Sequence, residues 1–290
     1  MHKFLRAIGF SDITKKDLEM ILDEVITRPE IMKITKDSEG NEFAELSGSF
    51  AANAGITVRG TYQEDDSFHM DYYYPYVFGT SITTNEQIDV EKHAEKESYA
   101  GVCDEVNLGV TLIFYIQNVA DYLAETNRHL SKIHYGAMLA GLSTEGKILC
   151  PVAERKKNDV PAIQKNDRHN QLIAQAREGD EDAIESLTLE DMDTYALLSQ
   201  RVMKEDIFSI VKSTFMPFGI ESDQYTVLGE IIDCVTMENK LTHEKLYGMK
   251  LLCNNIQFDV CINEKDLLGE PAIGRRFRGN VWMQGNLCLE

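Results

Sequence analysis

The stretch FAELSGSFAANAGITVRGTYQEDDSFHMDYYYPY, residues 43–76, decides the fold. It holds three short runs rich in β-branched and aromatic residues, at 43–50, 56–62 and 68–76. Two turn-forming segments, Asn53-Ala54-Gly55 and Gln63 to Ser67, separate these runs. Short runs of this composition with tight connections are typical of antiparallel strands. The stretch therefore predicts an antiparallel meander, which residues 88–97 and 108–116 could extend.

Helices are expected on both sides of this meander. Thr14 can cap the start of the first helix, with Asp17 at the third helical position, where a carboxylate suits the positive helix end. Apolar residues then repeat at helical spacing: Leu18, Ile21, Leu22, Val25 and Ile26. This spacing predicts one buried stripe on a helix that ends near Pro29. A second helix is expected over residues 118–134.

The rest of the chain divides into a helical part and a second β-rich part. Residues 164–213 follow a helical pattern, and eight carboxylates without Lys or Arg lie within 178–193. Strand-like runs return at 225–237, 246–253, 256–262 and 281–289, a set of the size of a small closed barrel or OB-like sheet. We therefore expect an α+β protein in three parts. Residues 1–160 form an antiparallel sheet with flanking helices, 161–222 a helical connector, and 223–290 a small C-terminal β-barrel-like (OB-like) domain.

Composition and charge exclude several classes of protein. The 290 residues are 43% hydrophobic and 27% charged, which is ordinary globular usage and is enough to bury a core. The formal net charge of −19 repels nucleic-acid phosphates and anionic lipid. The sequence shows no nucleic-acid-binding module, and none of the common nucleotide-binding, zinc-protease or serine-hydrolase motifs. We therefore expect no nucleic-acid partner, no membrane partner and no cofactor.

The six cysteines indicate the compartment. None belongs to a CxxC pair, and most have apolar neighbours, as in Ile148-Leu149-Cys150. This pattern favours reduced thiols in the core rather than zinc ligands or disulfides. The first residues have too short an apolar run for a signal sequence, and the most apolar stretch, 108–116, is far shorter than the ~20 residues of a membrane-spanning helix. We expect a cytoplasmic protein.

The candidate ligand site is an arginine-rich loop near the end of the chain. Arg275, Arg276 and Arg278 lie between Gly274 and Gly279, and Trp282 follows. Guanidinium groups suit phosphate or carboxylate, and an indole ring can stack on a base. The alternative interpretation is structural, with the arginines paired to Asp or Glu and Trp282 in the core.

Two further patterns have a functional and a structural interpretation. Glu91, His93, Glu95 and Glu97 would share one face of a strand and could bind a divalent ion, but charged runs are usually solvated, and we expect no metal there. Tyr72, Tyr74 and Tyr76 would share another strand face. That face could be a binding wall, but a half-buried sheet face is the commoner case.

Four strings of sequence together resemble a known family. They are MHKFLRAIGF at 1–10, LIFYIQN at 112–118, FMPFGIE at 215–221 and GRRFRG at 274–279. They are similar to a bacterial family described as a domain of unknown function, from anaerobic gut Firmicutes. The resemblance runs over the whole chain and implies a cytoplasmic bacterial protein. It assigns no activity, ligand or catalytic residue.

Two hypotheses for function follow from these patterns. The first is a non-enzymatic binding or assembly protein, whose partner contacts the acidic connector and the tyrosine face. The second is an enzyme or ligand-binding protein for a phosphorylated small molecule or nucleotide, with Arg275, Arg276 and Arg278 holding the anion. The two hypotheses differ in whether the arginines converge on an open pocket.

Overall fold

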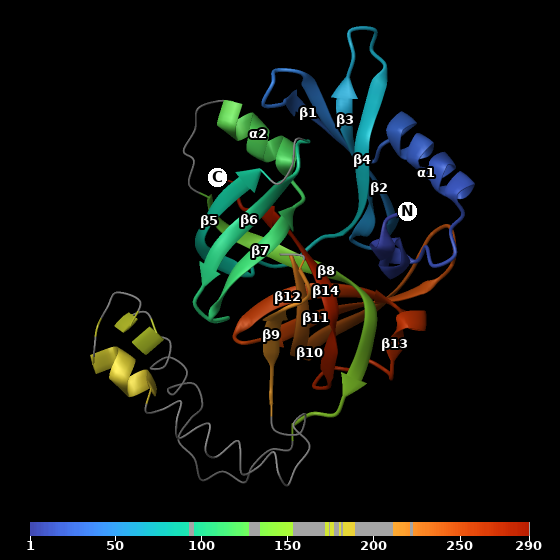
Figure 1. The fold of residues 1–290 in the computed structure, drawn as a ribbon. Helices are drawn as coiled ribbons and strands as arrows, with labels where there is room; N and C mark the ends of the chain where they lie inside the picture. The colour runs from blue at the N-terminus through green and yellow to red at the C-terminus, as the bar shows by residue number, and fades with distance from the viewer. Residues whose placement is uncertain are drawn as a thin grey trace.

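The computed structural model of the chain describes residues 1–92, 96–127, 134–152, 172–173, 175–176, 180, 182–188, 211–220 and 223–289. In these residues the protein is mostly β, with mainly antiparallel strand pairing and few helices (Figure 1). The strands form a four-stranded sheet and a ten-stranded sheet.

The first sheet is the predicted meander with one additional strand. Its order is β1 (Ile31–Lys36), β2 (Glu42–Ala51), β3 (Ala54–Tyr62) and β4 (Phe68–Val77), all antiparallel. Helix α1 (Lys15–Thr27) packs on β2 and β3, and η1 (Lys3–Ile8) contacts β4 and the second sheet (Figure 1). The predicted cap is confirmed, since Thr14 accepts a hydrogen bond from the Asp17 N–H over 3.2 Å. The buried residues of the stripe are Leu18, Leu22 and Val25.

The second sheet combines the middle and the end of the chain. Its order is β11-β12-β8-β5-β6-β7-β14-β10-β9, with β13 paired to β8. The bounds are β5 (Thr84–Lys92), β6 (Tyr99–Glu105), β7 (Val110–Ile116), β8 (His134–Leu149), β9 (Thr214–Pro217), β10 (Gln224–Glu238), β11 (Lys245–Cys253), β12 (Ile256–Asn263), β13 (Leu267–Leu268) and β14 (Arg276–Leu287). The short helix η2 (Glu264–Asp266) precedes β13, and α2 (Val119–Asn127) follows β7.

Several expectations require correction. The strands near residues 88–97 and 108–116 exist as β5 and β7, but they belong to the second sheet and do not extend the meander. Of the helix expected over 118–134, the structure describes α2 at Val119–Asn127, residues 128–133 lie outside the described residues, and His134 begins β8. The helical connector was expected to reach residue 222, whereas Thr214–Pro217 is a strand paired with β10. Most of the predicted connector, and most of its acidic run, lies outside the described residues.

The C-terminal strands are not a clean barrel. Strands β8, β10, β11, β12 and β14 do pair in a ring, with β10 joined to both β11 and β14. However, β8 also pairs with β5, and β14 also pairs with β7, so the ring continues into a larger sheet. The expected boundary between 222 and 223 therefore does not coincide with a sheet boundary. Long-range pairing of β8 with β14 joins residues from both predicted domains.

Two hydrophobic clusters organise the interior. One lies within the second sheet and includes Phe114, Phe258 and Phe277. The other joins η1, α1 and the first sheet to Leu142 and Trp282 of the second sheet. The two sheets thus share a packed boundary, and the buried polar groups described below lie along it.

Candidate functional site

The arginines of the predicted site point to different surroundings. Arg275 is exposed, and its Nη1 donates to the Glu270 carbonyl over 2.6 Å. Arg276 is buried, and it donates to two backbone carbonyls, from Nε to Cys150 over 2.9 Å and from Nη1 to Val211 over 2.6 Å. Burial lowers the pKa of Arg276. These hydrogen bonds of Arg275 and Arg276 therefore go to backbone carbonyl groups.

Arg278 and Trp282 are separated as well. Arg278 lies opposite Lys147 on the neighbouring strand, and both line an open cavity of about 470 Å³ with Glu145 and Asn280. Trp282 is buried: its ring stacks on Phe4 with centroids 5.2 Å apart. Its Nε1 donates to Asp223 over 2.7 Å. Of the four predicted site residues, Arg278 alone lines this cavity.

The proposed metal-binding run can be followed only in part. His93 and Glu95 lie outside the described residues. Glu97 is buried and accepts hydrogen bonds from Ser38 Oγ over 2.5 Å, from Lys92 over 2.9 Å and from Tyr99. Burial alone would raise the pKa of Glu97, but these three donors lower it below its ordinary value. Within the ranges that the structure describes, no group of His, Cys, Asp or Glu is arranged to hold a metal ion.

The tyrosine face turns inward and surrounds a buried arginine. Arg59 on β3 is completely buried, and its Nη1 donates to the hydroxyls of Tyr72 over 2.9 Å and Tyr115 over 2.7 Å. Its Nη2 donates to the Tyr74 hydroxyl over 3.2 Å and to the backbone carbonyl of Gln117 over 2.9 Å. The face is thus part of the packed boundary between the sheets rather than an open wall.

Glu45 connects this arginine to helix α2. Its carboxylate lies 2.6 Å from Arg59 Nη2, and its second oxygen accepts from the Ala120 N–H over 2.9 Å. Ala120 is in the first turn of α2, where backbone N–H groups lack partners within the helix and a negative charge is favourable. One carboxylate therefore joins β2, β3 and α2.

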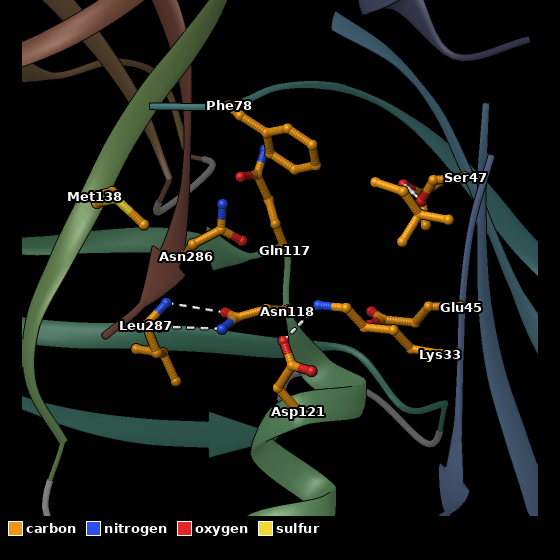
Figure 2. A pocket seen from close by; sticks show the side chains of 12 residues that line it. Lys33, Glu45, Ser47, Phe78, Gln117, Asn118, Asp121, Met138, Asn286 and Leu287 are labelled. Carbon is orange, nitrogen blue, oxygen red and sulfur yellow. Dashed lines mark hydrogen bonds and ion pairs between the residues drawn. The ribbon is translucent and has the colours of Figure 1, made fainter. Parts of the chain in front are cut away.

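A cavity of about 320 Å³ lies beside Glu45, between the two sheets (Figure 2). We call it the inter-sheet cavity. Its wall is formed by Ile31, Lys33, Glu45, Ser47, Thr57, Phe78, Gln117, Asn118, Asp121, Met138, Asn286 and Leu287. Most of these residues come from β1, β2 and β3 on one side, and from β8, β14, the β7–α2 connection and the start of α2 on the other, and Phe78 directly follows β4.

A chain of amide groups ends in the wall of this cavity. Gln284 donates from Nε2 to the Pro75 carbonyl over 2.9 Å and accepts at Oε1 from Gln117 Nε2 over 2.8 Å. Gln117 Nε2 also donates to the Val77 carbonyl over 2.9 Å. The orientation of both amide groups is fixed, because exchanging the nitrogen and oxygen of either side chain would place its oxygen against the carbonyl of Val77 or Pro75. Gln117 Oε1, which is buried, has no hydrogen-bond partner among the described residues.

The remaining polar groups of the cavity are mostly paired. Ser47 and Thr57 share a hydrogen bond of 2.8 Å between their hydroxyls. Lys33 and Asp121 form an ion pair of 2.5 Å that spans from β1 to α2, and both are partly exposed (Figure 2). Asn118 donates to the Leu287 carbonyl over 3.0 Å and accepts from its N–H over 2.9 Å. Among the described wall residues, Gln117 is thus a buried group whose hydrogen bonding is incomplete.

Sequence reasoning did not find this site, because its parts are far apart in the chain. In the sequence, Gln117 and Asn118 are only the end of the mainly apolar string LIFYIQN at 112–118. One signal was present: Glu45 and Arg59 lie at directly opposed positions of the β2–β3 hairpin, and Ser47 opposes Thr57. When an acid opposes a base, or one hydroxyl opposes another, inside otherwise apolar strands, the pairs indicate that the sheet has a polar face that is buried.

Comparison with known proteins defines the family and little else. Within the described ranges, no helix has the length and apolar character that crossing a membrane demands. No curated protein and no solved structure matches this chain. Residues 5–285 match the family described as "Domain of unknown function, E. rectale Gene description (DUF3881)". Since the match spans nearly the whole sequence, the chain belongs to this family, named for a gene of E. rectale.

Proposed function

We propose that this protein is a non-enzymatic binding protein whose small-molecule ligand occupies the inter-sheet cavity. The observation that carries the proposal concerns Gln117, which lines the cavity and whose buried side-chain carbonyl has no partner among the described residues. A buried acceptor without a donor costs about 1–3 kcal/mol, so a ligand that supplies a donor gains that energy on binding.

The size and lining of the cavity support a small ligand. Binding pockets are about 300–1,000 Å³ and are mainly apolar with a few placed polar groups. The inter-sheet cavity, at about 320 Å³, is at the small end of this range. Its apolar wall includes Ile31, Phe78, Met138 and Leu287. These dimensions favour a metabolite over a peptide.

The state of the polar groups supports binding rather than catalysis. The described residues that line the cavity include neither His nor Cys. The Ser47 hydroxyl is bonded to Thr57 and not to a general base, and the Glu45 oxygens are held by Arg59 and Ala120. A nucleophile needs an adjacent base to be activated, and these contacts do not provide one.

The alternative function, recognition of a phosphorylated small molecule or nucleotide, has weaker support. Its best observation is that Arg278 and Lys147 line the same open cavity. Arg276 is engaged with backbone carbonyls elsewhere, and the Glu145 carboxylate in that cavity wall would repel an anion.

A cytoplasmic location is proposed on the free state of all six cysteines, each of which lies in the described part of the chain.

A matched pair of β1 variants tests the proposed function. Ile31 and Ile34 are 43% and 44% exposed, but only Ile31 is among the residues that line the cavity. Ile31→Trp would fill the cavity, whereas Ile34→Trp adds the same side chain on the other strand face. The proteins are incubated with a bacterial metabolite extract, separated from unbound material and denatured, and the released small molecules are identified by mass spectrometry.

We expect the wild-type protein and Ile34→Trp to retain a small molecule. The amount that Ile31→Trp retains should be about tenfold lower, which corresponds to ~1.4 kcal/mol of lost affinity. Equal retention by all three proteins would place the ligand outside the cavity. Retention of no small molecule by the wild-type protein would contradict a binding function.

A further inference from the structure

We propose that the ligand of the inter-sheet cavity carries a neutral carboxamide or lactam group on a flat apolar body. This inference rests on the proposed function and goes further by assigning a chemical class. The proposed recognition is a pair of hydrogen bonds, with the ligand N–H donating to Gln117 Oε1 and the ligand carbonyl accepting from the Asn286 amide. The direction of the amide chain that ends at Gln117, in the cavity wall, supports this assignment.

The amide chain makes Gln117 Oε1 a strong acceptor. Each amide donates through its nitrogen to the carbonyl of the next, from Gln117 to Gln284 over 2.8 Å and from Gln284 to Pro75 over 2.9 Å. Hydrogen bonds in such a row polarise one another in the same direction. The terminal carbonyl of Gln117 is therefore an enhanced acceptor, and it requires an N–H or O–H donor.

Asn286 supplies the second half of the recognition. The Gln117 N–H donates to the Gly285 carbonyl over 2.8 Å, and Asn118 bonds the backbone of Leu287 on the other side. These contacts place Asn286 beside Gln117, and both line the cavity (Figure 2). The Asn286 carboxamide makes no hydrogen bond to another described residue. Gln117 Oε1 is an acceptor, and the neighbouring Asn286 amide can donate. A ligand group in which an N–H is next to a C=O is complementary to this pair.

The charges in the wall favour a neutral ligand. The Glu45 carboxylate is compensated by Arg59 at 2.6 Å, and the Asp121 carboxylate by Lys33 at 2.5 Å. The charged side chains among the described wall residues are therefore already paired and cannot neutralise an ionic ligand taken out of water. Burying an unpaired ion is costly. A carboxylate ligand would in addition face the Gln117 carbonyl and the oxygens of Glu45. The apolar side chains of Phe78, Met138 and Leu287 can cover a flat body.

A series of matched ligands tests this inference on the wild-type protein, so that folding of a variant is not in question. The probes are benzamide, acetophenone and benzoate, titrated by calorimetry. Acetophenone has nearly the same shape as benzamide but carries a methyl group in place of the amide N–H₂, and benzoate adds a charge. Benzamide should bind about tenfold more tightly than either, as expected when a buried acceptor loses its donor.

Two variants locate the contact. Asn286→Ala should weaken benzamide about fivefold or more, because it removes one hydrogen bond. The matched control Gln257→Ala, at an exposed position of β12, should leave the affinity unchanged. Ile31→Trp should abolish binding of every probe that enters the cavity.

The outcomes separate this inference from the proposed function. If benzamide and acetophenone bind equally, and Ile31→Trp abolishes both, the cavity binds ligands but the carboxamide assignment is wrong. If benzamide does not bind while the extract experiment yields another molecule that depends on Ile31, the assignment is again wrong and the binding function stands. Failure of both experiments overturns both proposals.

Discussion

Glu45 and Arg59 lie at directly opposed positions of the β2–β3 hairpin, with a carboxylate oxygen 2.6 Å from a guanidinium nitrogen that is completely buried. The pair lies at the boundary between the sheets, where Arg59 also contacts Tyr115 of β7 and the backbone carbonyl of Gln117. The same carboxylate contacts the first turn of α2 and forms part of the cavity wall. The ion pair thus fixes the relative position of the two walls of the proposed site.

Removing one partner of this pair is expected to be strongly destabilising. Glu45→Gln keeps the shape but leaves the Arg59 charge buried without its counterion, at a cost of ~3–5 kcal/mol in the free energy of unfolding. The measurement is denaturant unfolding at neutral pH. The exposed acid Glu42, on the same strand, provides the control Glu42→Gln, which should change stability by less than about 0.5 kcal/mol. Equal effects of the two variants would show that the buried pair does not hold the sheets together.

The arginine loop gives a second contrast. Arg276→Gln should cost ~2–4 kcal/mol, because the carbonyls of Cys150 and Val211 would lose charged donors in a buried place. Arg275→Gln, at the exposed neighbouring position, should stay within about 0.5 kcal/mol. Thermal and denaturant melts of both variants provide the comparison. A near-neutral Arg276→Gln together with stabilisation of the wild-type protein by phosphate would favour the anion-binding alternative.

Thiol reactivity should follow burial. Burial raises the pKa of Cys253 and of Cys261 to about 12, and it does the same for Cys103, where nearby carboxylates add to the effect. These three thiols should therefore remain unreactive in the native protein, because the thiolate is the reacting form. Cys150 is the exposed cysteine and should react first. Counting reacted thiols in native and denatured protein, with Cys150→Ser as the reference, tests this order. Fast native labelling of more than three cysteines would contradict it.

Glu97 should make stability sensitive to acid. Its folded-state pKa is lowered by the donors Ser38, Tyr99 and Lys92, despite the opposing effect of burial. The resulting stabilisation is complete above the ordinary pKa of 4.5 and is lost as the pH falls through the lowered value. Glu97→Gln should cost ~1–3 kcal/mol at neutral pH, with the difference from wild type shrinking in acid. Glu91→Gln, at an exposed position of β5, is the control. A difference that stays constant down to the acid transition would argue against the ionised carboxylate as the cause.

The local elements that sequence predicts well are those with strong local signals. The Thr14 cap and the apolar stripe define α1, and the turns at 53–55 and 63–67 define the hairpins of β2, β3 and β4. Strand β8 was missed because its glycines are poor strand formers. The structure explains them: a Cβ at Gly141 would come within 1.9 Å of Val281, and one at Gly146 within 2.4 Å of Phe277. These glycines are required by β14, which lies far away in the sequence.

The site was beyond local reasoning for a related physical reason. The arginine loop is recognisable in the sequence because its charges are adjacent in the chain. The cavity is not, because it is assembled from separate elements that include β1, β2, β3, β8, β14 and the start of α2. The residues next to Gln117 in the sequence form no recognisable motif. Its side-chain amide is oriented by donation from Nε2 to Gln284 and Val77, and this orientation leaves its side-chain oxygen without a partner. Only the three-dimensional arrangement shows that its amide is oriented and its oxygen unpaired.

The most direct test of the central claim is an NMR spectrum of the side-chain amide groups, recorded with and without the small molecules retained from the metabolite extract. If the ligand occupies the inter-sheet cavity and completes the amide chain, the Nε2–H signals of Gln117 and Gln284 should shift together. The signals of Gln63 and Gln257, which lie away from the cavity, should stay in place. Unchanged signals of Gln117 and Gln284 in the presence of a bound ligand, or shifts confined to the surroundings of Arg278 and Lys147, would contradict the account.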